Sequence, residues 1–245
     1  ICCSLSDKKG DCGVYLKKEW LKERFNDGLI FNKINVRGKA FIEYIPIENA
    51  WVPIEGNDYM FINCFWVSGR YKGQGNSNLL LEECIKDSKE KGKKGLVVLS
   101  SKKKKPYLSD PEFLRYKGFK LADTLESYFE LLYLPFDEDS IKPSFNDNVK
   151  RSTVENEGFV LYYSHQCPFT AKYVPIIEEV ANSKGIKFKS VLFETYEEAQ
   201  NSPCPFTTYA LFYNGDFVTH EILNKNRFEK IVDKLVQQRS EGNVY

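Results

Sequence analysis

The sequence predicts a mixed α/β (α+β) protein in which a polar segment joins two units. One observation is the order of elements up to residue 136, where three strand-like runs precede a helix, a strand, a helix and two more strands. Another is the stretch Val67 to Glu83, in which a strand, a glycine-bearing turn and an amphipathic helix follow one another. A third is a new alternation of strands and helices after residue 157. These patterns predict a larger unit over 1–136, a linker over 137–157 and a smaller unit over 158–245.

Composition places the chain among soluble globular proteins. It has 245 residues, of which 42% are hydrophobic and 28% charged, and its net charge is +1. This balance gives no overall attraction to nucleic acid or membranes, and no apolar run approaches the length of about 20 residues that spans a bilayer. Seven cysteines, an odd number without regular spacing, indicate reduced thiols. We therefore expect a cytoplasmic protein with no nucleic-acid or membrane partner.

The first unit is expected to begin with a short helix, followed by three strands that form an antiparallel meander. The second strand alternates apolar and polar residues, which predicts one solvated face, and the third is almost continuously apolar, which predicts a central position. The expected elements are a helix over 17–25, strands over 29–36, 39–47 and 59–67, a helix over 78–91, a strand over 95–101, a helix that starts at Asp110-Pro111, and a closing hairpin that ends near 136.

The turn that holds Gly73 and Gly75 is the candidate binding site of this unit. Neither glycine has a Cβ, so the backbone can approach a ligand closely. The first N–H groups of the following helix have no intrahelical partners, and the helix dipole adds partial positive charge there. The site therefore favours an anion such as a diphosphate, with Lys72 and Arg70 adding full charge. The spacing fits neither a P-loop nor the dinucleotide fingerprint.

The segment Lys72 to Ser77, KGQGNS, resembles motif A of the GNAT (Gcn5-related) N-acetyltransferase family. The family usually has Arg or Gln where Lys72 stands and Gly or Ala where Ser77 stands, so positive charge and small size are kept. The stretch DPEFLRYKGF resembles the family's motif B, and the order of elements is that of the GNAT fold without its first strand, as a clipped N-terminus would give. The resemblance implies a GNAT domain with a mainly antiparallel sheet over 1–136.

The same resemblance implies an acetyl-CoA-dependent N-acetyltransferase, in which an amine attacks the thioester directly in a ternary complex. The acceptor would be a small-molecule or peptide amine, and a homodimer is left open. No metal is expected, since two histidines far apart in the sequence do not make a metal site. The residues that would bind the cofactor are Val67, on the strand that pairs with the pantetheine arm, and Lys72, Gly73, Gln74, Gly75, Asn76 and Ser77 around the pyrophosphate.

The general acid and the general base have several candidates. Many relatives carry the acid as a motif B tyrosine, but that position is Leu114 here; Tyr116 would point off another helix face, and a half-buried aromatic is its alternative role. Glu43 is a candidate base, unless it is a solvated carboxylate on its alternating strand. Glu48 and Glu55 are further candidates. The amine can also lose its proton to a chain of water molecules.

Lysines and aromatic residues flank this region. Lys102 to Lys105 would contact the CoA 3′-phosphate or an acidic substrate, unless they form a solvated loop. Trp51, Phe65 and Trp66 would line an apolar or aromatic amine pocket, unless they belong to the core.

The second unit shows the order strand, helix, strand, helix, strand, strand, helix. This order resembles a thioredoxin-like domain, and its combination with a GNAT unit resembles the small group with a YoaP-like C-terminal domain. The elements are expected over 159–164, 172–183, 186–194, 196–200, 209–213, 217–223 and 225–238, with Asn214-Gly215 in a hairpin turn.

Cys167 stands at the first strand-to-helix turn of this unit, where a helix dipole stabilises a thiolate. Thr170 replaces the resolving cysteine, which resembles monothiol variants of the thioredoxin-like motif. Cys204 precedes Pro205 in the region of that fold's cis-proline loop, so the resemblance implies a disulfide between Cys167 and Cys204. His165 either tunes Cys167 or is a surface residue. The alternative function is therefore a thiol-redox or redox-sensing protein with a CoA-binding or degenerate GNAT unit, and a redox-inactive binding or dimerisation domain is also open.

Overall fold

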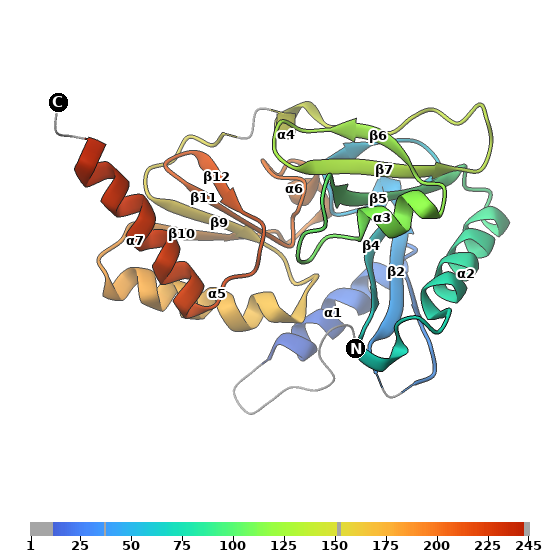
Figure 1. Cartoon of the computed structure of the whole chain (residues 1–245), viewed down its shortest axis with the longest axis horizontal. Coiled ribbons are helices and arrows are strands. Elements are labelled where there is room, and N and C mark those ends of the chain that lie inside the picture. Colours follow the sequence, from blue (N-terminus) through green and yellow to red (C-terminus); the bar gives the residue numbers. More distant parts are fainter. Residues whose placement is uncertain (1–11, 37, 151–152, 243–245) are drawn as a thin grey trace.

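The fold is seen in a computed structural model, which describes residues 12–36, 38–150 and 153–242. Two α/β units lie side by side and share a hydrophobic core (Figure 1). Within the described ranges, no helix is long and apolar enough to cross a membrane.

The first unit is built on a six-stranded sheet with the order β1-β2-β4-β5-β7-β6. Within it, β4 and β5 pair in parallel, and the four other pairs are antiparallel. The prediction of a mainly antiparallel sheet with the third expected strand near its centre is confirmed. The strands are β1 (Ile30–Lys33), β2 (Ala40–Pro46), β4 (Tyr59–Val67), β5 (Gly95–Ser101), β6 (Lys120–Thr124) and β7 (Phe129–Pro135).

Both faces of this sheet are covered. On one face, Leu80 and Leu114 pack from helices α2 and α3. On the other, Trp20 of helix α1 packs together with Phe212 of the second unit. Strand β2 is consequently buried at every position except Pro46, so the predicted solvated face of this strand is wrong. The helices are α1 (Gly13–Asn26), α2 (Asn76–Glu90) and α3 (Pro111–Tyr116).

The second unit has a four-stranded sheet with the order β10-β9-β11-β12, and its elements follow the predicted order along the chain. Strands β9 and β10 are parallel, whereas β11 is antiparallel to both of its neighbours. Helix α5 begins four residues before its predicted start, because Pro168 occupies the first helical position. The elements are β9 (Phe159–Tyr163), α5 (Pro168–Ser183), β10 (Phe188–Leu192), α6 (Tyr196–Gln200), β11 (Tyr209–Tyr213), β12 (Asp216–Thr219) and α7 (Lys225–Gly242).

The segment between the two sheets, for which the sequence predicted a linker, holds two short elements. Strand β8 (Ser144–Phe145) pairs with β3 (Ile54–Glu55), and helix α4 (Asp147–Lys150) follows it. Phe145 and Val149 are 1% and 0% exposed and belong to the core that the units share. Two apolar side chains in a polar stretch give no periodicity, which is why the sequence pattern did not show these elements.

Hydrogen bonds also join the units. Gln200 Nε2 donates to the backbone oxygens of Glu48 and Ala50, at 3.1 Å each, and Thr207 Oγ1 donates to the backbone oxygen of Trp51. These bonds connect the second unit to the segment after β2, which continues as the 3₁₀ helix η1 (Ile47–Asn49).

His220 fixes the loop after β5 to the second unit. Its Nε2 lies 2.8 Å from the carbonyl oxygen of Pro106, and because a carbonyl only accepts, Nε2 carries the proton. Its Nδ1 then accepts from the Tyr128 hydroxyl at 2.6 Å. His220 is 1% exposed, and this burial lowers the pKa of its ring, in keeping with a neutral imidazole.

Candidate functional site

Strands β4 and β5 separate part-way along their length. Their parallel pairing ends at Ile62 and Val98, yet β4 continues to Val67 and β5 to Ser101. The second half of β4 therefore has an edge that is not bonded to β5. Unpaired N–H and C=O groups on such an edge can bind an extended ligand as a further strand would.

A β-bulge in β4 marks the same point. Glu43 of β2 pairs with Cys64, and Tyr44 pairs with Ile62, so Asn63 is the extra residue. The bulge lies next to the last residue that pairs with β5. Because a bulge bends its strand and increases the local twist, it accounts for the separation of β4 from β5.

The glycine turn follows β4. The 3₁₀ helix η2 (Gly69–Tyr71) leads into it, and Gly75 is the N-cap of α2. Gly73 and Gly75 have φ angles of +71° and +79°, which favour glycine. A Cβ built on either residue would meet no atom of the described residues within 4 Å. These described residues therefore leave the space beside the two glycines unfilled.

The first turn of α2 offers backbone donors. Its first intrahelical bond runs from the Leu79 N–H to the Gly75 oxygen at 3.0 Å. In the described part of the chain, the N–H groups of Asn76, Ser77 and Asn78 donate no hydrogen bond. These donors add to the dipole of a 15-residue helix, so the turn fits an anionic group such as the pyrophosphate of a CoA ester.

Side chains of the turn brace it. Gln74 Nε2 donates to the Arg70 oxygen at 2.8 Å, and Asn76 Nδ2 donates to the Tyr71 oxygen at 2.9 Å. Lys72 is exposed, with its Nζ 5.4 Å from the centre of the Trp66 ring. Val67, at the end of β4, is buried, and the chain runs from this strand end through the turn into α2.

Glu43 is buried, contrary to the alternative of a solvated carboxylate. It is 1% exposed, and its two carboxylate oxygens lie 2.8 and 2.9 Å from Nζ of Lys17, which is 0% exposed. Sequence reasoning missed Lys17. The signal was available, because residues 17, 20 and 21 share one face of α1, and Trp20 and Leu21 on that face are apolar.

Glu48 and Glu55 lie at the other end of the sheet. The last residue of β2, Pro46, pairs with Met60 near the start of β4, so both glutamates come after the end that is remote from the bulge. Glu48 pairs with Lys93 at 3.2 Å. Neither carboxylate is brought to the separated half of β4.

Tyr116 points into solvent. It is 82% exposed, whereas Leu114 on the same short helix is fully buried, so the expected difference in helix face is confirmed. The alternative of a half-buried aromatic is wrong: α3 ends at Tyr116, and the side chain is left largely in solvent there. A general acid must come within hydrogen-bond reach of the reacting atoms, and this side chain is directed away from the sheet.

The lysine loop is mostly solvated. Residues 102–104 are exposed, Lys104 pairs with Asp110, and Lys105 Nζ lies 4.0 Å from the centre of the Tyr128 ring. The three aromatic candidates differ in their surroundings and exposure. Trp51 is 3% exposed in the shared core and Phe65 packs on Phe113, whereas Trp66 is 43% exposed beside the separated half of β4.

The two cysteines of the second unit lie in different environments, and neither is in a disulfide. Cys167 is half-buried at the N-cap of α5, as predicted for the first strand-to-helix turn. Cys204 is 2% exposed in the core shared by the units, and burial raises the pKa of its thiol to about 12. His165, expected either to tune Cys167 or to lie at the surface, is partly buried, and this burial lowers the pKa of its ring.

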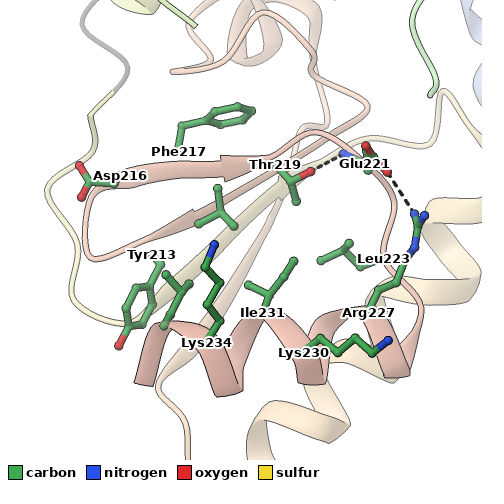
Figure 2. A pocket seen from close by; sticks show the side chains of 12 residues that line it. Tyr213, Asp216, Phe217, Thr219, Glu221, Leu223, Arg227, Lys230, Ile231 and Lys234 are labelled. Atoms are coloured by element: carbon green, nitrogen blue, oxygen red, sulfur yellow. Dashed lines mark hydrogen bonds and ion pairs between the residues drawn. The ribbon is translucent and has the colours of Figure 1, made fainter. Parts of the chain in front are cut away.

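An open groove of about 580 Å³ lies between β12 and α7 (Figure 2). Its walls combine apolar residues such as Ile231 and Leu223 with an ion pair between Arg227 and Glu221, 3.1 Å apart. None of the residues that line this groove belongs to the glycine turn or to the bulge. Among the described residues, no cluster of three or more His, Cys, Asp or Glu is arranged to hold a metal ion.

Comparison with known proteins supports the family resemblance. The chain is 43% identical to the N-acetyltransferase YoaP of Bacillus subtilis (strain 168) over 235 residues, which are 96% of this chain and 94% of that protein. Residues 187–230 match a family model described as YoaP-like.

Solved structures resemble the chain more remotely. A PaiA N-acetyltransferase from Thermoplasma acidophilum, in complex with coenzyme A, has a TM-score of 0.39 and 19% identity, and covers 51% of this chain and 74% of its own. A GNAT acetyltransferase from Elizabethkingia anophelis with acetyl-CoA bound has a TM-score of 0.34 and 18% identity, and covers 49% and 83%. At these values no residue role is transferred from either structure.

Proposed function

The chain belongs to the GNAT N-acetyltransferase family, and from this premise we propose that it transfers the acetyl group of acetyl-CoA to an amine by direct attack in a ternary complex. The acceptor in this proposal is a small-molecule or peptide amine. The observation that carries it is the open glycine turn at the start of α2, placed directly after a strand that has left its parallel partner.

Each part of this site has a role in the proposal. Acetyl-CoA supplies the acetyl thioester. The unpaired edge of β4 up to Val67 binds the amide groups of the pantetheine arm, and the N–H groups from Gly73 to Ser77 bind the pyrophosphate. Lys72 adds positive charge beside the phosphates. Holding the thioester and the amine in one orientation is the main contribution that these residues make to the rate.

Proton transfer requires a group near the amine. The amine nitrogen forms a bond to the acetyl carbon, the carbon–sulfur bond breaks, and the amine gives up a proton. Glu43 remains the candidate base, and because it is buried against Lys17 it would receive that proton through a water molecule. The leaving group is the CoA thiolate, and Tyr116, exposed to solvent, would protonate it as the acid only if the CoA sulfur came within reach of α3.

Calorimetry of acetyl-CoA binding tests the proposal. Gly75→Glu places a carboxylate and a side chain where the pyrophosphate would bind. Gly92→Glu is a matched control, because Gly92 lies at the other end of α2, has a φ of +69° and likewise has open space around an added Cβ. We expect the two variants to lose similar stability and only Gly75→Glu to lose binding. No binding to the unaltered protein, or equal binding to both variants, would contradict the proposal.

A second candidate is thiol chemistry at Cys167, in a redox or redox-sensing protein that retains CoA binding. The half-buried position of this thiol at the N-cap of a 16-residue helix supports it. In this candidate Cys204 would be the partner thiol, although its burial disfavours the thiolate. Faster alkylation of Cys167 than of a model thiol, lost in Cys167→Ser, would support it, and alkylation at the model rate would contradict it.

A further inference from the structure

We propose that Asn63 binds the acceptor amine, with its Oδ1 atom accepting an N–H of the amine that attacks the thioester. This inference rests on the proposed acetyl transfer and adds to it a residue that no sequence motif marked. It is drawn from the hydrogen bonds of the bulge.

The orientation of the Asn63 amide follows from its neighbour. Asn63 Nδ2 lies 3.3 Å from Glu43 Oε1, and Glu43 is held as a carboxylate by Lys17. A carboxylate only accepts hydrogen bonds, so the amide nitrogen, and not the amide oxygen, must face it. The Oδ1 atom therefore points away from Glu43.

The Asn63 Oδ1 atom is a buried acceptor in need of a donor. It is buried and has no hydrogen-bond partner among the residues that the structure describes. Leaving such an acceptor unpaired costs on the order of 1–3 kcal/mol. The residue as a whole is only partly buried, whereas its Oδ1 atom is buried, so an amine that donates to Oδ1 must displace the groups that cover it.

Asn63 also lies where the reacting groups would meet. It is the first residue of β4 beyond the last pair with β5, and its side chain is on the face that α1 covers, together with Glu43. The glycine turn lies farther along the same strand, at the start of α2. A thioester held along this edge of β4 would bring its carbonyl carbon toward the bulge.

The charges around Asn63 suit a nucleophilic amine. Lys17 and Glu43 carry opposite charges 2.8 Å apart, so the pair adds little net field beside the Asn63 amide. A lone carboxylate beside the amine would stabilise its ammonium form, which has no lone pair and does not react. The neutral amide oxygen of Asn63 can accept an N–H of the amine without favouring that charged form. The site therefore favours a primary or secondary amine, which keeps one N–H for Asn63 while its lone pair faces the thioester.

The test uses n-butylamine as the probe. In a ¹H–¹⁵N spectrum of the unaltered protein without acetyl-CoA, we expect added n-butylamine to shift the side-chain amide signal of Asn63, identified through backbone assignment. In a second measurement, CoA release from acetyl-CoA is followed against n-butylamine concentration. Asn63→Leu keeps the branched outline of the side chain but removes both the Oδ1 acceptor and the Nδ2 donor to Glu43. Loss of the hydrogen bond to the amine should lower kcat/KM for n-butylamine roughly tenfold.

Asn146→Ala provides the matched control. Asn146 has a similar arrangement, with Nδ2 donating to the Gln200 oxygen and a buried Oδ1 that lacks a partner in the described residues, but it lies between the units. We expect this variant to keep its kcat/KM and both variants to keep their affinity for acetyl-CoA.

Three results separate the hypotheses. An unmoved Asn63 signal in the presence of n-butylamine would overturn the assignment and indicate a structural water at Oδ1. Equal kcat/KM for Asn63→Leu and the unaltered protein would overturn it as well. Failure of the proposed function would instead appear as absence of acetyl-CoA binding to the unaltered protein.

Discussion

The two units carry the same local arrangement, a strand followed by a turn and a helix N-terminus, and they complete it in opposite ways. In the first unit, β4 leads through the glycine turn into α2. In the second, β9 leads through residues 164–167 into α5. The two helices have similar lengths of 15 and 16 residues, so their dipoles do not distinguish them.

The number of open backbone donors distinguishes them. The first three residues of α2 all have N–H groups without a partner in the described chain. In α5, the first residue is Pro168, which has no N–H, and the Thr170 N–H bonds to the Cys167 oxygen at 3.2 Å. The Thr170 hydroxyl lies 2.8 Å from the oxygens of both Cys167 and Ser164, and its one proton is shared between these two acceptors.

Side chains close the second turn further. Gln166 Nε2 donates to Ser164 Oγ at 3.0 Å and to Thr207 Oγ1 at 2.9 Å, which connects the turn to the loop between α6 and β11. The glycine turn of the first unit has Gly73 and Gly75 at the corresponding places, and its backbone N–H groups are left available to a ligand. A helix N-terminus therefore becomes an anion site only where the local sequence leaves its donors unused.

A carboxylate in the first turn of α2 should give the largest effect. In Ser77→Glu the new side chain competes for the N–H groups of that turn, and a negative charge there favours the helix by about 0.3–1 kcal/mol. We expect acetyl-CoA affinity to fall by more than roughly tenfold, which is about 1.4 kcal/mol, while thermal stability is kept or raised. Calorimetry and thermal unfolding of the same samples measure the two effects.

Ala171→Glu, near the start of α5, is the change in the second unit that corresponds to Ser77→Glu. It should leave acetyl-CoA affinity as it is, because α5 starts with Pro168, which has no N–H, and the N–H of Thr170 is already bonded to the Cys167 oxygen. Equal losses of affinity in the two variants would show that charge anywhere on the protein, and not the glycine turn, governs binding.

Removing the Thr170 hydroxyl should give an intermediate effect of a different kind. Thr170 is 0% exposed, and Thr170→Val keeps its shape while leaving the Ser164 and Cys167 oxygens with one donor fewer. We expect a loss of about 1 kcal/mol in the free energy of unfolding, measured in urea, with no change in acetyl-CoA affinity. Reduced affinity in this variant would mean that the second turn takes part in cofactor binding.

The sequence predicted the open turn well because its signal is local. Glycines at Gly73 and Gly75 and an apolar run before them specify strand, turn and helix without reference to the rest of the chain. The apolar run over 59–67 likewise placed its strand near the centre of the sheet. The YoaP-like order of the second unit was predicted for the same reason.

Contacts between distant segments could not be predicted in the same way. The alternating pattern of β2 suggested a solvated Glu43. In the structure Glu43 is buried, and its ion pair with Lys17 of α1 offsets the free-energy cost of removing the carboxylate from water. Asn63 is a polar residue in the apolar run over 59–67, but no sequence pattern singled it out, because its position depends on a one-residue shift in register against β2. The buried Phe145 and Val149 depend on packing between the units.

Replacing His165, in the turn between β9 and α5, should give the smallest effect on stability. It tests whether this turn is packed away from solvent. Burial lowers the pKa of His165 below its ordinary value of 6.5, so the folded protein binds fewer protons than the unfolded chain as the pH falls through 6.5. The stability that the neutral ring contributes is complete above that pH and is lost below it. In His165→Phe the free energy of unfolding should therefore fall less between about pH 7.5 and pH 5.5 than in the unaltered protein. Urea titrations at the two pH values would measure this difference.

His220, whose pKa burial also lowers, contributes the same pH dependence to the free energy of unfolding in both proteins. An identical fall in the variant would mean that the His165 ring is solvated, and that the second turn is as open as the first.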